Sequence, residues 1–347
     1  MRIEDEIKLT FDDVLIRPKR STLVSRSEVV LERQFKFKHT NEIWTGVPIF
    51  SANMDTTGTF ETAITLQKHK MLTAIHKFYS IKDWEKNVEK LDPNFISVTV
   101  GQSKEDLQLG QKIFSLNSDI KYLCIDVANG YREDFINSVK NYRETFPDKI
   151  IIAGNVATRE MTEALILAGA DIVKIGIGPG SVCTTRSVAG VGYPQLSSIS
   201  ECSDAAHGLG GHVMADGGCK YPGDVSKAFG AGADYVMLGG MFAGHKESGG
   251  ELVTDEEGVQ YKDFYGMSST KAQQTYYGDL AEHRAPEGKK VRLRYKGELD
   301  KTVQSILGGM RSACSYVGAK KLKDLPKSTT FIRVTQTTNE IFTGRET

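Results

Sequence analysis

Short apolar runs recur along this chain with helical segments between them, and this alternation limits the possible folds more than any other feature of the sequence. The eight runs are rich in β-branched residues, and they span 47–51, 71–75, 95–100, 122–126, 150–153, 170–175, 211–215 and 234–238. Such continuous runs are typical of parallel strands that are buried on both faces. Eight strands of this kind predict an α/β fold of the (β/α)8 TIM-barrel type rather than an open sheet.

The segments between the runs carry apolar residues at helical spacing. Helices are predicted over 60–69, 81–91, 105–116, 134–146, 200–207 and 302–310. Thr158 is the predicted N-cap of a further helix, because a threonine side chain at that position can accept a backbone hydrogen bond. The helix over 302–310 is expected to close the barrel.

Three segments lie outside the eight units. Residues 1–44 are charged and irregular, so we expect a leader that packs on the outside of the barrel. Residues 245–298 contain no strand–helix unit, and we expect a mobile flap after the eighth strand that closes over the site. The threonine-rich tail, 326–347, is expected to be extended. The whole chain, 1–347, is therefore predicted to be a single catalytic barrel domain.

The composition argues against several classes of protein. The chain holds 44 Lys and Arg against 44 Asp and Glu, which is unlike the basic excess of a nucleic-acid-binding protein. No apolar stretch approaches the ~20 residues of a membrane span, and the acidic N-terminus does not resemble a signal peptide. The five cysteines form no C-x-x-C pair, which argues against a disulfide framework and a zinc site. We expect a cytoplasmic protein that binds neither nucleic acid nor membrane.

One loop, residues 174–186, combines glycines with a cysteine directly after the sixth run. Its glycines permit backbone angles closed to other residues and allow a ligand to approach the main chain closely. Cys183 is surrounded in sequence by hydroxyls and a cation, at Ser181, Thr184, Thr185 and Arg186. This setting suits a nucleophilic thiolate, whereas the alternative is a small buried cysteine that packs like alanine. The spacing alone leaves both interpretations open.

Polar residues and glycines collect where the predicted strands end, at 51–55, His76, Lys77, Asp126, Asn129, Gly130, Gly154, Asn155, 216–218 and 239–240. In a TIM barrel, ligands bind at this end of the strands. Glycine turns after the seventh and eighth strands expose backbone N–H groups to an anion. A phosphorylated ligand is therefore predicted, although the chain has no Rossmann dinucleotide fingerprint.

These motifs resemble those of the IMP dehydrogenase/GMP reductase family. The similar stretches are 178–185, 214–218, 231–240 and the Pro-Glu-Gly of the flap. Within the family, the reductases are the closer resemblance, through 51–55, 264–269, 306–318 and 329–333. Two absences agree with this, because the chain has no room for the regulatory modules of most dehydrogenases, and 276–280 lacks their water-activating Arg-Tyr pair.

The resemblance implies a reductive deamination in which GMP and NADPH yield IMP, ammonia and NADP. Cys183 would attack C2 of the purine to form a covalent thioimidate, and hydride from NADPH would reach the same carbon. Thr185 and Glu287 match the proton-relay pair of the family, which would protonate the leaving amine. The resemblance also implies a homotetramer, and a monovalent cation (K⁺) held by the carbonyls of Gly178, Gly180 and Cys183.

Binding residues follow from the same resemblance. Substrate contacts are expected at Ser181, Asp216, Gly217, Gly218, Gly239, Gly240, Gly266, Met267, Ser268, Arg284 and Gly288. NADPH contacts are expected at Lys77, Asp126, Ala128, Asn129, Ser312, Ala313, Cys314 and Tyr316. Two other functions stay open: an IMP dehydrogenase that lacks the regulatory modules, and a non-catalytic barrel that binds purine nucleotides.

Overall fold

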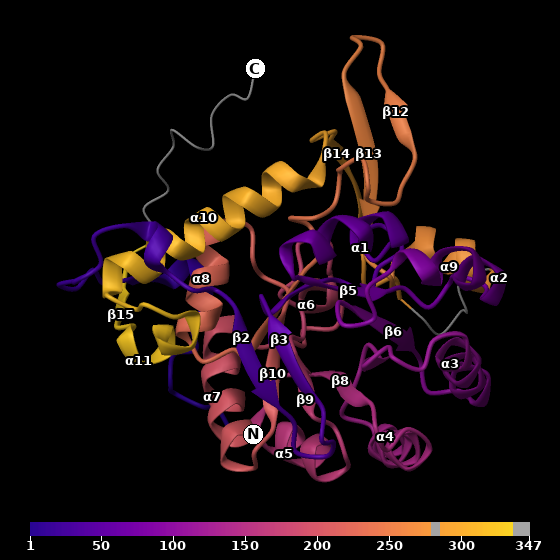
Figure 1. Ribbon diagram of the computed structural model, residues 1–347, viewed down its shortest axis with the longest axis horizontal. Coiled ribbons are helices and arrows are strands. Elements are labelled where there is room, and N and C mark those ends of the chain that lie inside the picture. The colour runs from indigo at the N-terminus through magenta and orange to yellow at the C-terminus, as the bar shows by residue number, and fades with distance from the viewer. Residues whose placement is uncertain (279–284, 336–347) are drawn as a thin grey trace.

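The computed structural model describes residues 1–278 and 285–335, and at its centre eight strands close into a barrel (Figure 1). In chain order they are β4 (Ile49–Ser51), β5 (Leu72–Ile75), β6 (Ile96–Val100), β7 (Tyr122–Asp126), β8 (Ile150–Val156), β9 (Ile172–Ile175), β10 (His212–Asp216) and β11 (Tyr235–Leu238). Each strand pairs in parallel with the next, and β11 pairs with β4 to complete the circle. The prediction of a TIM barrel is confirmed.

Helices alternate with the strands and surround the barrel (Figure 1). They are α1 (Phe60–Leu66), α2 (Ile81–Asn87), α3 (Lys104–Leu116), α4 (Glu133–Thr145), α5 (Arg159–Leu167), α7 (Gln195–Gly208), α8 (Pro222–Gly230) and α10 (Leu299–Val317). Short 3-10 turns lie at Phe11–Asp13, Arg26–Glu28, Gln67–His69, Val88–Lys90 and Leu322–Asp324. Local sequence explains the starts of α2 and α3, since Ser80 and Ser103 form capping boxes. Thr158 occupies the predicted N-cap position of α5, but its side chain accepts no capping hydrogen bond.

Two helices are longer than predicted. Helix α7 begins at Gln195, and α10 continues past Met310 to Val317. The apolar spacing of α10 persists to its end, where Gly318 adopts the left-handed conformation that terminates it (φ 75°). A Cβ at Gly309 would lie 2.7 Å from the Cβ of Pro222 in α8, so glycine allows the two helices to pack closely. This packing outweighs the low helix propensity of the glycine.

The second half of the N-terminal segment was predicted to be irregular, but it forms a hairpin that packs from outside on the base of the barrel. Strands β2 (Arg33–Lys36) and β3 (Ile43–Gly46) form an antiparallel hairpin. Its Phe35 is buried and stacks on Tyr235, the first residue of β11, with ring centroids 4.5 Å apart. The prediction was wrong because the aromatic partners of this short hairpin lie far away in the sequence.

The first part of the N-terminal segment is tied to the C-terminal region. Strand β1 (Val14–Ile16) pairs antiparallel with β15 (Phe331–Arg333), which follows the short helix α11 (Leu325–Ser328). Residues 336–347 of the predicted extended tail lie outside the described residues.

The segment 245–298 contains no strand–helix unit of the barrel type, but it is a folded arm rather than an irregular loop. Strands β12 (Leu252–Thr254), β13 (Gln260–Tyr265) and β14 (Lys290–Arg294) form an antiparallel sheet, and α9 (Thr270–Tyr277) follows β13. Figure 1 shows this sheet projecting away from the barrel. Whether the arm moves over the site stays a prediction.

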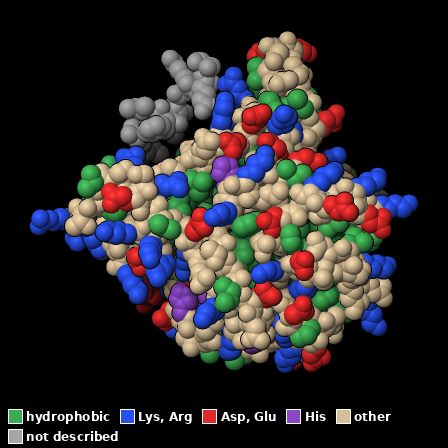
Figure 2. All heavy atoms as spheres, viewed as in Figure 1, with side chains coloured by type: hydrophobic (Ala, Val, Ile, Leu, Met, Phe, Trp, Pro, Cys, Tyr) green, Lys and Arg blue, Asp and Glu red, His purple; other side chains and the backbone are tan. Residues whose placement is uncertain are grey.

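The surface carries both signs of charge. On the face shown in Figure 2, acidic and basic side chains are interspersed over the whole outline of the barrel. Within residues 1–278 and 285–335, no helix has both the length and the apolar character needed to cross a membrane.

Candidate active site

The cysteine loop runs from the end of β9 to the short helix α6 (Thr185–Val188) at the C-terminal end of the barrel strands. Gly176 begins the loop with φ 154°, and a Cβ there would lie only 2.1 Å from the carbonyl oxygen of Asp216. Only glycine fits this approach to the neighbouring strand end. The loop then turns back on itself, because the backbone N–H of Cys183 donates to the carbonyl of Gly180 at 3.1 Å.

Cys183 differs from the other cysteines in its surroundings. Its sulfur lies 3.2 Å from the Thr185 hydroxyl, and its side chain is partly exposed. In contrast, burial raises the pKa of Cys124 to about 12 and the pKa values of Cys202 and Cys314 to about 11. Cys219 is partly exposed like Cys183, but burial raises the pKa of its thiol well above the usual value. These four thiols therefore stay protonated and inert at neutral pH, which leaves Cys183 as the better candidate for a nucleophile.

The folded arm joins the cysteine loop through backbone hydrogen bonds. The Thr184 N–H donates to the carbonyl of Glu287 at 3.0 Å, and the Lys289 N–H donates to the carbonyl of Val182 at 2.9 Å. On the other side of this arm segment, the Glu287 N–H donates to the carbonyl of Ser268 at 3.2 Å. Residues about a hundred positions apart are thus held next to one another, and the backbone of Glu287 is fixed beside Cys183.

Close contacts within the arm explain its glycines. A Cβ at Gly288 would lie 2.9 Å from the Ser269 nitrogen, and a Cβ at Gly266 would lie 3.1 Å from the Val182 carbonyl oxygen. Met267 and Ser268, which are predicted to meet the base, follow Gly266 and are half-buried. The structure therefore brings this predicted substrate segment against the cysteine loop.

The predicted phosphate site is also assembled from separate segments. A Cβ at Gly240 would lie 3.1 Å from the Ser181 hydroxyl oxygen, so the end of β11 and the cysteine loop are in contact. A Cβ at Gly217 would lie 3.2 Å from the Gly180 nitrogen, and both Gly217 and Gly218 have left-handed φ angles of 89° and 90°. These turns place glycine backbone from two strand ends around Ser181, which suits an anion.

A buried lysine links two of the predicted binding carboxylates. Lys174 of β9 is buried, and its ammonium lies 2.6 Å from Asp126 Oδ1 and 2.9 Å from Asp216 Oδ2. The Asn155 side chain donates to the same Asp216 oxygen at 2.9 Å. Burial alone would raise the pKa of Asp126, but the charge and hydrogen bond of Lys174 outweigh it, and the net pKa is lowered. Asp126 therefore stays ionised.

Lys174 and Asn155 are functional candidates to which sequence analysis gave no role. A lysine inside an otherwise apolar strand, Ile172-Val-Lys-Ile175, is the signal that could have identified the first of them. The second is one of the polar residues at the strand ends, and nothing in the sequence pairs it with Asp216.

The predicted cofactor residues fall into two groups. In the first group, Lys77 lies near Asp126, since its charge acts to lower the Asp126 pKa. Asn53, which was not predicted as a cofactor contact, also lies there and lowers that pKa through a hydrogen bond. Ala128 and Asn129 are exposed just beyond β7. Ser312, Ala313, Cys314 and Tyr316 instead lie on the outer helix α10. Within this second group, the Cys314 side chain is buried in the core between barrel and helices, so it cannot touch a bound cofactor in this chain.

The arm is anchored to the first strand end by two tyrosines. Asp55 accepts hydrogen bonds from Tyr265 at 2.5 Å and from Tyr276 at 2.6 Å. The Tyr276 ring also stacks on Phe78, with centroids 3.6 Å apart and planes inclined by 13°. Sequence analysis missed this anchor because it joins residues more than two hundred positions apart.

Three further predictions concern the edges of the site. Arg284, a predicted substrate contact, lies outside the described residues. The carbonyls predicted to hold a monovalent cation belong to Gly178, Gly180 and Cys183, and all three lie in the turn of the cysteine loop. Carbonyl oxygens are ligands that hard cations prefer. Gly239, a predicted phosphate contact, lies at the end of β11, where a Cβ would be 3.4 Å from the Met54 sulfur.

The resemblance seen in the motifs extends along the whole chain. A family model described as IMP dehydrogenase / GMP reductase domain matches residues 8–341. A GMP reductase from Buchnera aphidicola subsp. Acyrthosiphon pisum (strain Tuc7) is 58% identical over 345 residues, which cover 99% of each chain. GMP reductases from Escherichia coli O81 (strain ED1a) and Enterobacter sp. (strain 638) are 57% identical over 345 residues with the same coverage.

Proposed function

Because this chain belongs to the IMP dehydrogenase/GMP reductase family, we propose that it is a GMP reductase, which converts GMP, NADPH and two protons into IMP, NADP and ammonium. The observation that carries this proposal is the full-length similarity, at 57–58% identity, to proteins named GMP reductase. The contact between Cys183 and Thr185, beside the Glu287 backbone, supports it with the groups that the chemistry needs.

Cys183 acts as the nucleophile in this proposal. Its sulfur attacks C2 of the guanine base, the bond from C2 to the exocyclic amine breaks, and a thioimidate joins the sulfur to C2. An amine leaves only when it is protonated, so the thiol proton must reach it. The Thr185 hydroxyl, 3.2 Å from the sulfur, is positioned to pass that proton, with Glu287 as the second member of the relay.

The second half-reaction regenerates the thiol. NADPH, when bound, supplies the hydride that adds to C2. The sulfur then leaves as a thiolate and takes up a proton, and IMP is released. Asp126 stays ionised through its contact with Lys174, so it remains a hydrogen-bond acceptor for a cofactor amide or hydroxyl near Lys77.

The substrate would be held by the strand ends around the cysteine. Ser181 and the glycine turns at 217–218 and 239–240 would donate hydrogen bonds to the phosphate. Asp216 would accept hydrogen bonds from the ribose hydroxyls, and Lys174 and Asn155 fix its orientation. Met267 and Ser268 would meet the edge of the base, since their arm segment pairs with the segment that carries Glu287.

The remaining predictions belong to the same proposal. The cysteine-loop carbonyls would hold a potassium ion, whose charge would favour the loop turn. The enzyme would be a cytoplasmic homotetramer in purine nucleotide interconversion. An IMP dehydrogenase is the second candidate, because the matching family description covers both activities.

The deciding experiment measures absorbance at 340 nm with purified protein and potassium in two reactions. Loss of the NADPH signal with GMP, and no gain of signal with IMP and NAD, is the result expected of the reductase. A gain with IMP and NAD alone would show a dehydrogenase. Silence in both reactions, with GMP binding detected by calorimetry, would indicate a nucleotide-binding barrel without this activity.

A further inference from the structure

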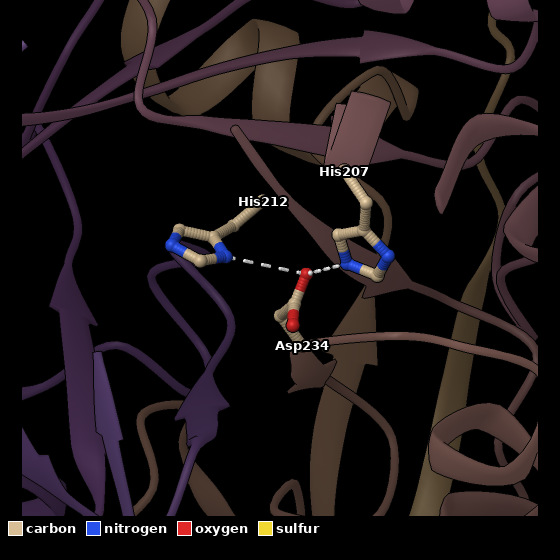
Figure 3. A group of neighbouring side chains, drawn as sticks. All are labelled: His207, His212 and Asp234. Carbon is tan, nitrogen blue, oxygen red and sulfur yellow. Dashed lines mark hydrogen bonds and ion pairs between the residues drawn. The ribbon is translucent and has the colours of Figure 1, made fainter. Parts of the chain in front are cut away.

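A second cluster of reactive side chains lies at the base of the barrel, at the opposite ends of the strands from Cys183. His212 is the first residue of β10, Asp234 immediately precedes β11, and His207 lies in the last turn of α7. One potential ligand atom from each lies within 4.8 Å of the other two. Figure 3 shows both imidazole rings directing a nitrogen toward the same carboxylate.

One carboxylate oxygen serves both histidines. Asp234 Oδ2 lies 2.7 Å from His207 Nε2 and 3.5 Å from His212 Nδ1. The other oxygen, Oδ1, is 3.1 Å from the Arg33 guanidinium of the β2–β3 hairpin. Arg33 therefore neutralises the carboxylate from one side, while Oδ2, which also accepts the Val213 N–H at 3.2 Å, is directed at the two rings.

The protonation of His212 is constrained by its other nitrogen. His212 Nε2 lies 2.9 Å from the carbonyl oxygen of Lys36, which can only accept, so Nε2 carries a hydrogen and donates it. In the neutral ring, Nδ1 then bears a lone pair that faces the Asp234 carboxylate. This Nδ1 is buried and makes no hydrogen bond with any described residue. In that neutral ring two acceptors would face each other, and a cation between them, either a proton on Nδ1 or a metal ion, would satisfy both.

We propose that His207, His212 and Asp234 bind a divalent transition-metal ion of the zinc class. Imidazole and carboxylate groups are ligands for such ions. Metal-binding histidines commonly donate their second N–H to a backbone carbonyl, as His212 does to Lys36. Ligands that each lie about 2.0–2.2 Å from a tetrahedral ion are roughly 3.3–3.6 Å apart. The distance of 3.5 Å from Asp234 to His212 fits that spacing, whereas the distance of 2.7 Å to His207 is shorter, so the half-exposed His207 ring would move outward when the ion binds.

The surroundings provide an entry path and a structural role. A pocket of about 390 Å³ beside the cluster is lined by both His207 and Asp234, so an ion can arrive from solvent and keep water as a fourth ligand. The ion would connect α7, β10 and the start of β11, and His212 would extend that connection to the hairpin through Lys36. The cysteine count could not reveal this site, because it contains no cysteine.

The test uses Co²⁺ as a spectroscopic probe, with Zn²⁺ as the competitor, on the full chain carrying Cys183→Ala. This background removes the thiol of the candidate active site, which would bind both ions, while Cys219, which is also partly exposed, is present in every protein compared. We expect one equivalent of Co²⁺ with the visible absorption of a four-coordinate ion, displaced by Zn²⁺. His207→Gln, a half-exposed position, should weaken binding by at least the ~10–100-fold seen when supporting groups of metal sites are lost.

Two further variants make the result specific. His212→Asn should weaken binding like His207→Gln, and either variant alone suffices if the other does not fold. His69→Gln is the matched control, because His69 also contacts a carboxylate, Asp300 at 2.6 Å, but belongs to no cluster of three potential ligands among the described residues. No Co²⁺ binding, or binding that His69→Gln weakens as much as His207→Gln does, would overturn the proposal. If NMR shows that both nitrogens of His212 are protonated and stay so after Zn²⁺ is added, the cluster is an ion pair and the proposal is overturned.

Discussion

Replacement of Lys174 by methionine should destabilise the protein strongly, because it leaves two neighbouring carboxylates without their shared cation. The ammonium contacts Asp126 at 2.6 Å and Asp216 at 2.9 Å, and the lysine side chain is only 3% exposed. Methionine keeps most of the volume of lysine, so the change removes charge rather than packing. The Asn155 contact to Asp216 would remain as partial compensation.

The expected loss can be estimated from burial. Removal of one partner of a buried ion pair typically costs about 3–5 kcal/mol. Because the Asp126 and Asp216 side chains are 29% and 21% exposed, water can reach them, and we expect the lower end of that range. An unfolding entropy of ~2.1 cal/mol/K per residue gives ~0.7 kcal/mol/K for this chain, so a loss of ~3 kcal/mol lowers the melting temperature by ~4 °C.

The loss should depend on pH. Lys174 lowers the pKa of Asp126 in the folded protein, so this contact contributes stability above the unfolded pKa of about 3.9 and loses it as the pH falls further. In the variant, burial without the lysine charge raises the pKa of Asp126, so this carboxylate takes up a proton more readily when folded than when unfolded. The difference in stability between wild type and variant should therefore be largest near pH 7 and smaller near pH 4.

Thermal unfolding monitored by circular dichroism at both pH values is the assay. Lys149→Met is the matched control, since this lysine is also mostly buried but its carboxylate partner, Asp148, is 68% exposed. The control should show a smaller loss with little change between the two pH values. A loss below ~1 kcal/mol for Lys174→Met, the scale of an exposed pair, or a loss equal at both pH values, would refute the reasoning.

Three predictions concern the proposed reaction. Cys183→Ala should abolish NADPH oxidation but keep GMP binding by calorimetry, and retained turnover would exclude the covalent step. Glu287→Gln should slow ammonia release by ~10²-fold or more, the usual effect of losing a general acid or base, while an unchanged rate would remove this residue from the relay. Tyr276→Phe keeps the ring on Phe78 but removes one of the two hydroxyl groups that donate to Asp55. A lost hydrogen bond to a charged group costs ~1.5 kcal/mol, so KM for GMP should rise about tenfold. An unchanged KM would mean that this hydroxyl does not hold the arm in place.

The barrel could be predicted from sequence because its signal is local. Each strand is a continuous apolar run, and a residue such as Ser103 at a helix start accepts a hydrogen bond from a backbone N–H three residues later. The β2–β3 hairpin was missed because its signal is not local. Nothing near Phe35 in the sequence indicates that its partner is Tyr235, two hundred residues later. Similarly, the close approach of α10 to Pro222 at Gly309 joins residues far apart in the sequence.

The candidate site divides in the same way. The Cys183 loop stands out by composition, and its glycines predict that another backbone segment lies close to it. The structure confirms this at Gly176, which lies against the carbonyl of Asp216. Glu287 could be named only by resemblance, since its position depends on backbone hydrogen bonds to Thr184 and Ser268. Lys174 could not be paired with Asp126 before the barrel was closed, because the two come from strands that are not neighbours in the sheet.

The two charged clusters at the ends of the barrel can be understood together. Lys174 with its carboxylates lies at one end, and Asp234 with its histidines lies at the other. The interior between them is filled by buried aromatic and aliphatic side chains, including Tyr122, whose hydroxyl meets that of Tyr235 at 3.4 Å. Each cluster contains its own counter-charge, so neither depends on the other across this apolar interior. Chemistry at the cysteine end can therefore change without loss of the ties that hold the base together.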